Sequence, residues 1–305
     1  MKDYIRDLLF CKGHKAPAKT QLSPYQHRKI VYGAKQQLAP DKDTSLRLDE
    51  AGIKRAQSIV GALIYYARAV ENKLLVALSV SQQAASTTNT ATAVHHLLDY
   101  VDTYPADGLF FRSSGMDLAA HANAGFNNES RSCSHAGAHI YLSEVDARPR
   151  WDGAVSAVAV IMKKVMASAE EAELDALYEC SREMVPLRQA LTEMGWPQGK
   201  SSIQTDNSTA GGVVNNTIVP KRLKFMNMRL HWLRCRDAQV QLRFFGHQAP
   251  TTGPITTPNT SPPSTTRASL QFLRASCQWN NPSAYAPICL RANMFYYYYF
   301  CIFIR

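Results

Sequence analysis

The spacing of apolar residues changes near Gly108, and this change constrains the fold more than any other feature of the sequence. Before Gly108, apolar residues recur at three- and four-residue steps, which is the period of an amphipathic helix. After it, runs such as MDLAAHANAGF (116–126) and SHAGAHIYLS (134–143) are typical of strands. The sequence therefore predicts two parts of different architecture, with a boundary where Pro105 and Gly108 interrupt the helical pattern.

The first part is expected to be helical. Residues 1–47 carry Pro, Lys and Gln with little periodicity and are predicted to form an extended N-terminal segment. A helical region then covers 48–108, with one helix after Leu48 and another from about 82 to 102.

The second part, residues 109–245, alternates between strand and helix patterns, which predicts a mixed α/β fold. A long amphipathic helix is expected at 169–195, where Pro186 should kink it or split it in two. The other expected elements are strands at 116–126, 134–143, 154–165, 201–207 and 240–245, a weak helix at 208–216 and a basic helix at 221–239.

Composition limits the possible functions. The formal net charge of +10 indicates a polyanionic partner such as nucleic acid, although a basic protein without such a partner remains an alternative. The 7 cysteines are scattered without a CxxC pair, which argues against a disulfide framework or a cysteine zinc site. The N-terminal residues do not read as a signal peptide, and no membrane span is expected. We therefore expect an intracellular protein of the cytoplasm or nucleus.

Several motifs, in order along the chain, resemble the Pol polyproteins of copia-type LTR retrotransposons. YGAKQQLAPDKDTSLRLDEAGIKRAQ (32–57) and IVGALIYYARAV (59–70) resemble the end of the reverse transcriptase region. ASAEEAELDAL (167–177), IQTDNSTA (203–210) and KFMNMRLHWLR (224–234) are similar to later elements of the same family. The resemblance implies a mainly helical reverse-transcriptase connection region at 48–108, followed by an RNase H-like domain with a mixed sheet flanked by helices.

The family's RNase H activity is hydrolysis of the RNA strand in RNA–DNA hybrids, assisted by two Mg²⁺ ions held by about four carboxylates. Carried over by position, the helix carboxylate falls on Glu173 and the next strand's on Asp206. The first-strand carboxylate falls on Asn123, an amide that brings no negative charge. Glu173 and Asp206 are therefore the expected catalytic remnants and metal ligands, with weak and unstable Mg²⁺ binding.

Ordinary structural roles could also account for these residue types at these positions. Glu173 lies in an acidic first turn, which often only complements a helix dipole, and Asp206 could cap the next helix. His135 and His139 read as ordinary strand residues rather than as a metal pair.

The basic helix is the expected nucleic-acid contact. Cationic side chains neutralise phosphates, although a solvated helix face is the alternative. The candidates are Lys221, Arg222, Lys224, Arg229, Arg234 and Arg236.

Residues 246–305 break the pattern, because Thr, Pro and Ser replace it after Phe245. One coding string for GHQAPTTGPITTPNT, read in a shifted frame, gives A-P-G-P-D-N-W-A-D-Y-H-T-K-H. That string resembles the family's W-x-P-G-x-x-N-x-A-D-x-x-T-K stretch, which carries the fourth carboxylate. The sequence therefore predicts a frameshift near residue 246 and a disordered out-of-frame tail, with a natural Thr/Pro-rich linker as the alternative.

Two hypotheses for function follow. The first is a degenerate, catalytically inactive fragment of a retrotransposon polyprotein. The second is a non-catalytic nucleic-acid-binding protein retained by a host, which binds RNA–DNA hybrid or another nucleic acid in a salt-dependent way. Residual metal-dependent RNase H activity is a third possibility.

Overall fold

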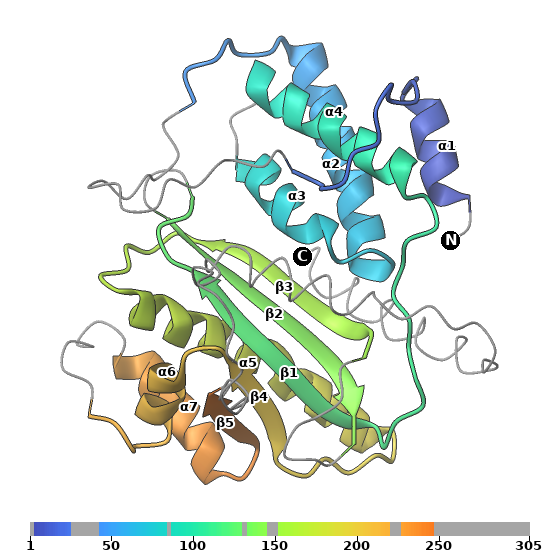
Figure 1. Ribbon diagram of the computed structural model, residues 1–305. Coiled ribbons are helices and arrows are strands. Elements are labelled where there is room, and N and C mark those ends of the chain that lie inside the picture. Colours follow the sequence, from blue (N-terminus) through green and yellow to red (C-terminus); the bar gives the residue numbers. More distant parts are fainter. Residues whose placement is uncertain are drawn as a thin grey trace, which may run out of the picture.

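A computed structural model describes residues 3–25, 43–83, 87–129, 133–144, 152–219 and 227–246. In these ranges the chain forms a helical layer, a five-stranded sheet and a second helical layer (Figure 1). The predicted tail after Gly246 lies outside the described residues, as does the first part of the predicted basic helix. None of the helices within these ranges is long and apolar enough to cross a membrane.

The first helical layer contains α1 (Tyr4–Cys11), α2 (Glu50–Ala69), α3 (Leu74–Gln83) and α4 (Thr88–Thr103). Asp49 caps α2 by accepting a hydrogen bond from the Gly52 amide, and Thr87 forms a capping box with Thr90 at α4. The four helices bury a shared core that includes Leu63, Leu78 and Leu97. The helical character of 48–108 is therefore as predicted.

Three details of this layer differ from the prediction. The N-terminal segment was expected to be extended, but it contains α1, whose Ile5 and Leu8 enter the shared core. Helix α3 was not predicted, because its sequence LLVALSVSQQ is apolar in most directions and shows no clear period. Helix α4 begins at Thr88 rather than near residue 82, because Thr87 supplies its cap.

The sheet confirms the predicted mixed α/β class. Its strands are β1 (Asp117–Gly125), β2 (Ser134–Ser143), β3 (Ala154–Met162), β4 (Ser201–Thr205) and β5 (Leu242–Gly246), in the spatial order β3-β2-β1-β4-β5. β1, β2 and β3 are antiparallel neighbours, whereas β4 runs parallel to both β1 and β5. Because β1 and β4 are parallel neighbours, their carboxyl ends meet at one edge of the sheet.

The second helical layer consists of α5 (Ala169–Glu193), α6 (Ser208–Val214) and α7 (Asn227–Ala238). Leu174, Leu177 and Met184 of α5 pack against sheet residues such as Ile140 and Phe244. The prediction that Pro186 could split the long helix was wrong, because α5 continues through it. Arg182, whose carbonyl would accept from residue 186, is exposed, so water can replace the missing hydrogen bond.

Helix α3 joins the first helical layer to the sheet (Figure 1). Ala157 and Ala159 of β3 pack against the helical core, and Ser79 of α3 contacts Nε2 of His135 on β2 at 3.1 Å. The sheet is therefore covered by α5, α6 and α7 on one side and by α3 on the other side at β3.

Candidate functional site

Asn123 and Asp206 lie at the carboxyl ends of neighbouring parallel strands. The β1–β4 register pairs Ala122 with Thr205, so Asn123 and Asp206 follow as the next two residues. Ala122 and Ala124 pack on the side of α5, and alternation along the strand therefore turns the Asn123 side chain to the opposite face. Asn123 is buried inside this edge of the sheet, whereas Asp206 is exposed at its surface.

Glu173 reaches the same edge from α5. Ser168 caps this helix by accepting a hydrogen bond from the Glu171 amide, which places Glu173 in the second turn beside the strand ends. The Ala124 amide donates to Oε1 of Glu173 at 3.0 Å, and the Thr205 hydroxyl donates to Oε2 at 3.4 Å. The structure thus brings Glu173 and Asp206 together, because their carboxyl groups interact. Asn123 lies at the same strand end, but its side chain faces away from α5.

The surroundings of Glu173 disfavour its charged form. Burial and the negative charge of Asp206 raise the pKa of Glu173 to about 8, although the hydrogen bonds from Ala124 and Thr205 act in the opposite direction. At neutral pH Glu173 is therefore mostly protonated in the metal-free protein. A bound cation would reverse this balance, because it stabilises the carboxylate.

The donor set at this edge does not fit a two-ion centre. It offers the two carboxyl groups of Glu173 and Asp206, whose hard oxygen donors suit one Mg²⁺ ion at most. The Asn123 amide faces away from α5, and its buried Oδ1 has no hydrogen-bond partner among the described residues. Two dications roughly 4 Å apart require more negative charge and a bridging carboxylate, and an amide supplies neither. No step of a two-ion reaction can therefore be derived from these residues.

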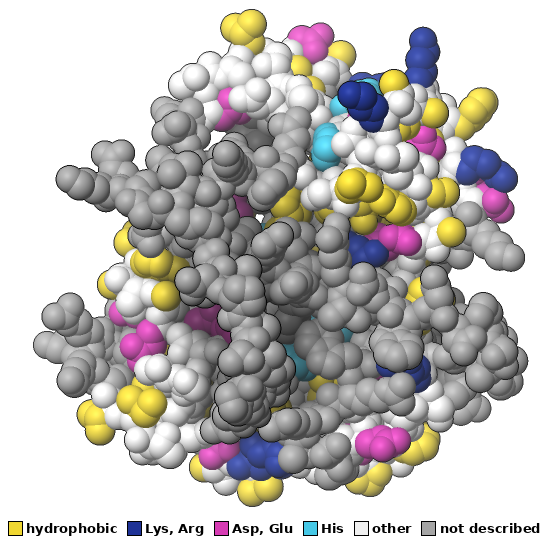
Figure 2. Space-filling view, in the orientation of Figure 1, with side chains coloured by type: hydrophobic (Ala, Val, Ile, Leu, Met, Phe, Trp, Pro, Cys, Tyr) yellow, Lys and Arg dark blue, Asp and Glu magenta, His cyan; other side chains and the backbone are white. Residues whose placement is uncertain are grey.

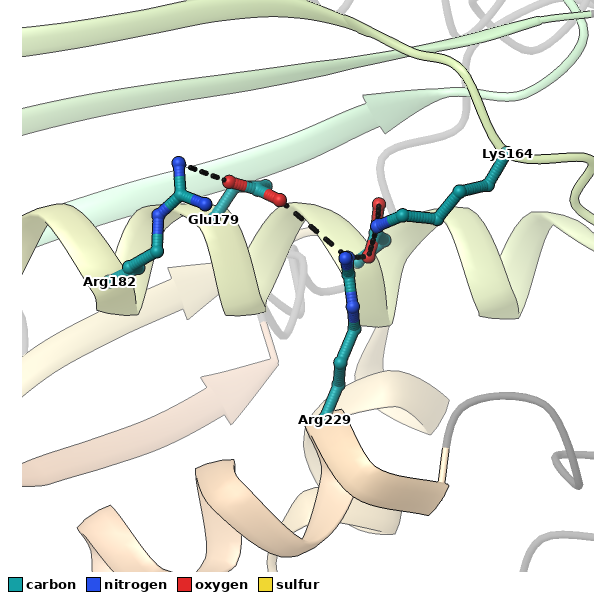
Figure 3. Close-up of polar contacts among 5 residues, drawn as sticks. Lys164, Glu179, Arg182 and Arg229 are labelled. Carbon is teal, nitrogen blue, oxygen red and sulfur yellow. Dashed lines mark hydrogen bonds and ion pairs between the residues drawn. The ribbon is translucent and has the colours of Figure 1, made fainter.

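A second charged cluster lies on α5, close to Glu173 in sequence. The Asp175 carboxylate is 1% exposed and contacts two cations, Lys164 at 3.2 Å and Arg229 of α7 (Figure 3). Arg229 also approaches Glu179 at 3.6 Å, and Glu179 pairs with the exposed Arg182 at 2.9 Å. The sequence alone did not single out Asp175, because its partners are distant in the chain.

The described part of the basic helix is engaged within the protein. Arg229 contacts Asp175, while Arg234 donates to the carbonyl of Val213 at 2.7 Å. Arg236 lies over the Trp232 ring at 4.8 Å and donates to Gln239 and Gln241. Lys221, Arg222 and Lys224 lie outside the described residues. On the face shown in Figure 2, the visible Lys and Arg side chains are scattered rather than gathered into one patch.

The strand histidines have partners in the protein. His135 contacts Ser79 and lies 3.5 Å from Glu129, while Nε2 of His139 lies 2.8 Å from the carbonyl oxygen of Asp152. Burial lowers the pKa of His139, which keeps this ring neutral. These contacts match the interpretation of both residues as ordinary strand histidines.

The chain is similar to a transposon polyprotein. It is 26% identical over 142 residues to the retrovirus-related Pol polyprotein from transposon TNT 1-94 of Nicotiana tabacum. The match covers 47% of this chain and 10% of that polyprotein, so the chain spans only a small part of its relative's length. The similarity confirms the predicted resemblance to a retrotransposon Pol polyprotein. No protein-family model matches the chain.

Two solved structures are also similar to parts of this chain. The N-terminal RNase H domain of rv2228c from Mycobacterium tuberculosis matches with 10% identity and a TM-score of 0.33, over 44% of this chain and 88% of that one. A foamy viral protease–reverse transcriptase in complex with double-stranded DNA matches with 13% identity and a TM-score of 0.40, over 68% and 39%. The five-stranded mixed sheet with flanking helices has the predicted RNase H-like arrangement.

Proposed function

We propose that this chain is a degenerate fragment of a copia-type retrotransposon Pol polyprotein, whose RNase H-like domain does not cleave RNA–DNA hybrids. One observation carries the proposal. Asn123 occupies the strand end beside Glu173 and Asp206, where the family resemblance places a carboxylate. Glu173 and Asp206 then supply two carboxyl groups where the family resemblance implies about four.

The loss of charge affects metal binding more than it affects the fold. An amide in place of a carboxylate still offers one carbonyl oxygen, and it packs in nearly the same volume. It cannot bridge two cations or balance their charge. The domain can therefore keep its core, which is fully formed around Leu174 and Ile203, while Mg²⁺ binding becomes weak.

A nuclease assay tests this proposal directly. The full chain is incubated with a hybrid labelled on its RNA strand, in Mg²⁺ and separately in Mn²⁺. We expect no metal-dependent cleavage above that of Asp206→Ala, a matched variant that also reports any contaminating nuclease. Cleavage by the natural chain that Asp206→Ala abolishes would contradict the proposal.

The variant Asn123→Asp tests whether the first-strand carboxylate alone is missing or the fourth carboxylate is missing as well. If the fourth carboxylate is also missing, as the family resemblance implies, restoring the first should leave cleavage undetectable. Cleavage by Asn123→Asp that requires Asp206 would mean that Asn123 is the single defect, and the part of the proposal that concerns the lost fourth ligand would be wrong.

The fourth carboxylate depends on the reading frame after β5. We propose a frameshift near residue 246, so that 246–305 is translated out of frame. Sequencing the gene and its transcript across codons 240–262 tests this. The expected result is that both carry the shift. A sequence in which A-D-x-x-T-K follows in frame would overturn it and return the fourth carboxylate.

A second candidate function is non-catalytic nucleic-acid binding, with retention by a host. The net charge of +10 favours it. Because Arg229, Arg234 and Arg236 are engaged within the protein, we expect only weak binding of an RNA–DNA hybrid. The affinity should fall steeply between about 50 and 200 mM salt. Tight binding that is insensitive to salt, measured by fluorescence anisotropy, would argue against this electrostatic mode.

A further inference from the structure

A group of two imidazoles and one carboxylate gathers where the N-terminal segment crosses α4. His14 follows α1, whereas His95 and Asp99 lie one turn apart on α4. Nε2 of His14 is 3.1 Å from Oδ1 of Asp99, and Nδ1 of His95 is 3.4 Å from Oδ2 of the same carboxylate. One ligand atom from each of the three residues lies within 4.8 Å of the others.

These separations are close to those of a tetrahedral metal centre. A zinc ion with bonds of about 2.0–2.2 Å holds neighbouring ligand atoms roughly 3.3–3.6 Å apart. The two imidazole rings lie 4.9 Å apart between centroids, and one nitrogen of each ring contacts a different oxygen of Asp99. With the three ligand atoms within 4.8 Å of one another, a rotation of the Asp99 carboxylate or of one ring would let them share an ion.

Two buried atoms in this group lack hydrogen bonds. His14 has a side chain that is only 1% exposed, yet among the described residues its Nε2 has no hydrogen-bond partner, and neither does the buried Oδ1 of Asp99 that faces it. A buried polar atom without a partner costs free energy. An ion pair alone would favour an aligned hydrogen bond between these atoms, whereas a metal ion would satisfy both at once.

We propose that His14, His95 and Asp99 form a site for a borderline divalent transition metal, with Zn²⁺ as the main candidate and a fourth position open to water. Imidazole nitrogen with one carboxylate oxygen is a donor set for Zn²⁺ rather than for Mg²⁺, which prefers oxygen alone. The scattered cysteines argued only against a cysteine site, and this site uses none.

The site would fasten the N-terminal segment to α4. The same segment already reaches α4 through His96, whose Nε2 lies 2.9 Å from the carbonyl oxygen of Ser23, and through the Gln21 amide, which donates to Thr103 at 3.2 Å. Histidine side chains (cyan in Figure 2) reach the surface over the helical layer. His95 is 66% exposed, so an ion can enter from solvent beside it.

Metal binding by the untagged full chain tests the proposal. Zn²⁺ affinity is measured by competition with a coloured chelator, and Co²⁺ is used as a spectroscopic probe of tetrahedral geometry. We expect one site, whose Zn²⁺ affinity falls at least about tenfold in His95→Ala. Because His95 is largely exposed, this variant should remain folded, which circular dichroism verifies.

Two further variants define the location of the site. His231→Ala removes an exposed imidazole on α7 and should leave Zn²⁺ affinity unchanged. Asp99→Asn should weaken binding as His95→Ala does. The proposal is overturned if the natural chain binds no Zn²⁺, if His95→Ala binds it as tightly as the natural chain, or if His231→Ala removes the binding.

Discussion

Glu173 and Asp175 lie two residues apart on α5 and are both buried, but the protein treats their charges differently. Asp175 is 1% exposed and contacts the cations of Lys164 and Arg229. Glu173 has no cationic side chain among its described partners and accepts hydrogen bonds only from neutral groups, while Asp206 adds a negative charge nearby. One carboxylate is paired with cations, and the other has its pKa raised.

This difference separates a structural carboxylate from one suited to an external cation. A buried carboxylate can be stabilised by a paired cation or by a proton. Asp175 has the first solution, built from residues of this chain. Glu173 has the second, because burial and the nearby charge of Asp206 favour its protonated form.

The largest effect should follow removal of the cation from Asp175. Arg229→Ala leaves this buried carboxylate with Lys164 alone, so we expect a loss of about 3 kcal/mol in the free energy of unfolding. Urea denaturation followed by circular dichroism measures it. The matched control is Arg182→Ala, whose side chain is 58% exposed and whose pair with Glu179 should contribute less than about 1 kcal/mol. Equal losses in the two variants would mean that the cation beside the buried Asp175 stabilises the fold no more than the exposed pair between Arg182 and Glu179.

Glu173→Gln should stabilise the protein at high pH. Between its ordinary pKa of 4.5 and its raised value of about 8, the unfolded chain releases this proton while the folded protein keeps it. The contribution of Glu173 to stability therefore falls as pH rises through this window and levels off above it. Glutamine does not titrate, so we expect Glu173→Gln to gain about 2 kcal/mol at pH 9 and little at pH 4.

The difference in stability between Glu173→Gln and the natural chain, measured by urea denaturation at both pH values, is the relevant readout. A gain of the same size at both pH values would mean that packing, rather than titration, causes it. Asp175→Asn is the sharper contrast, because it removes a charge that two cations stabilise and should therefore destabilise the protein.

The smallest effect should come from divalent ions at the edge of the sheet. Without metal, Asn123→Asp should lower stability by about 1 kcal/mol, because it adds a third acidic group near Glu173 and Asp206. Millimolar Mg²⁺ should reverse that loss in the variant and change the natural chain little. Thermal unfolding with and without Mg²⁺ measures both changes. A large Mg²⁺ effect on the natural chain would mean that its edge still holds an ion firmly.

The sequence predicted those parts of the fold that have a clear local pattern. Alternating or continuous apolar runs located β1, β2 and β3, and the four-residue apolar spacing located α2 and α5. Helix α3 was missed because it is buried within the helical layer at Leu74 and Leu78, which removes the polar face that reveals a helix. Its position was fixed by tertiary packing rather than by local pattern.

The candidate site was predictable only as far as motif positions could be carried over. The family resemblance indicated Asn123, Glu173 and Asp206, and the structure brings the last two together, with Asn123 at the same strand end. The partner of Arg229 could not be predicted, because Asp175 is distant in the chain and a basic helix gives no sign of which arginine is engaged. The cluster of His14, His95 and Asp99 could not be predicted either, because His14 is distant in the chain from the other two. His95 and Asp99 alone have the spacing of any two residues one helical turn apart.

The contact between α3 and the sheet bears on how the gene could be divided. Gly108 marks a clear change of pattern in the sequence, yet a fragment that began there would lose Ser79, the partner of His135, and the helical cover of Ala157 and Ala159. The alanine side chains of β3 at 157 and 159 would then face water on an edge strand, where other chains can add. A truncation at this boundary would therefore follow the change of sequence pattern but leave an aggregation-prone apolar surface on the sheet domain.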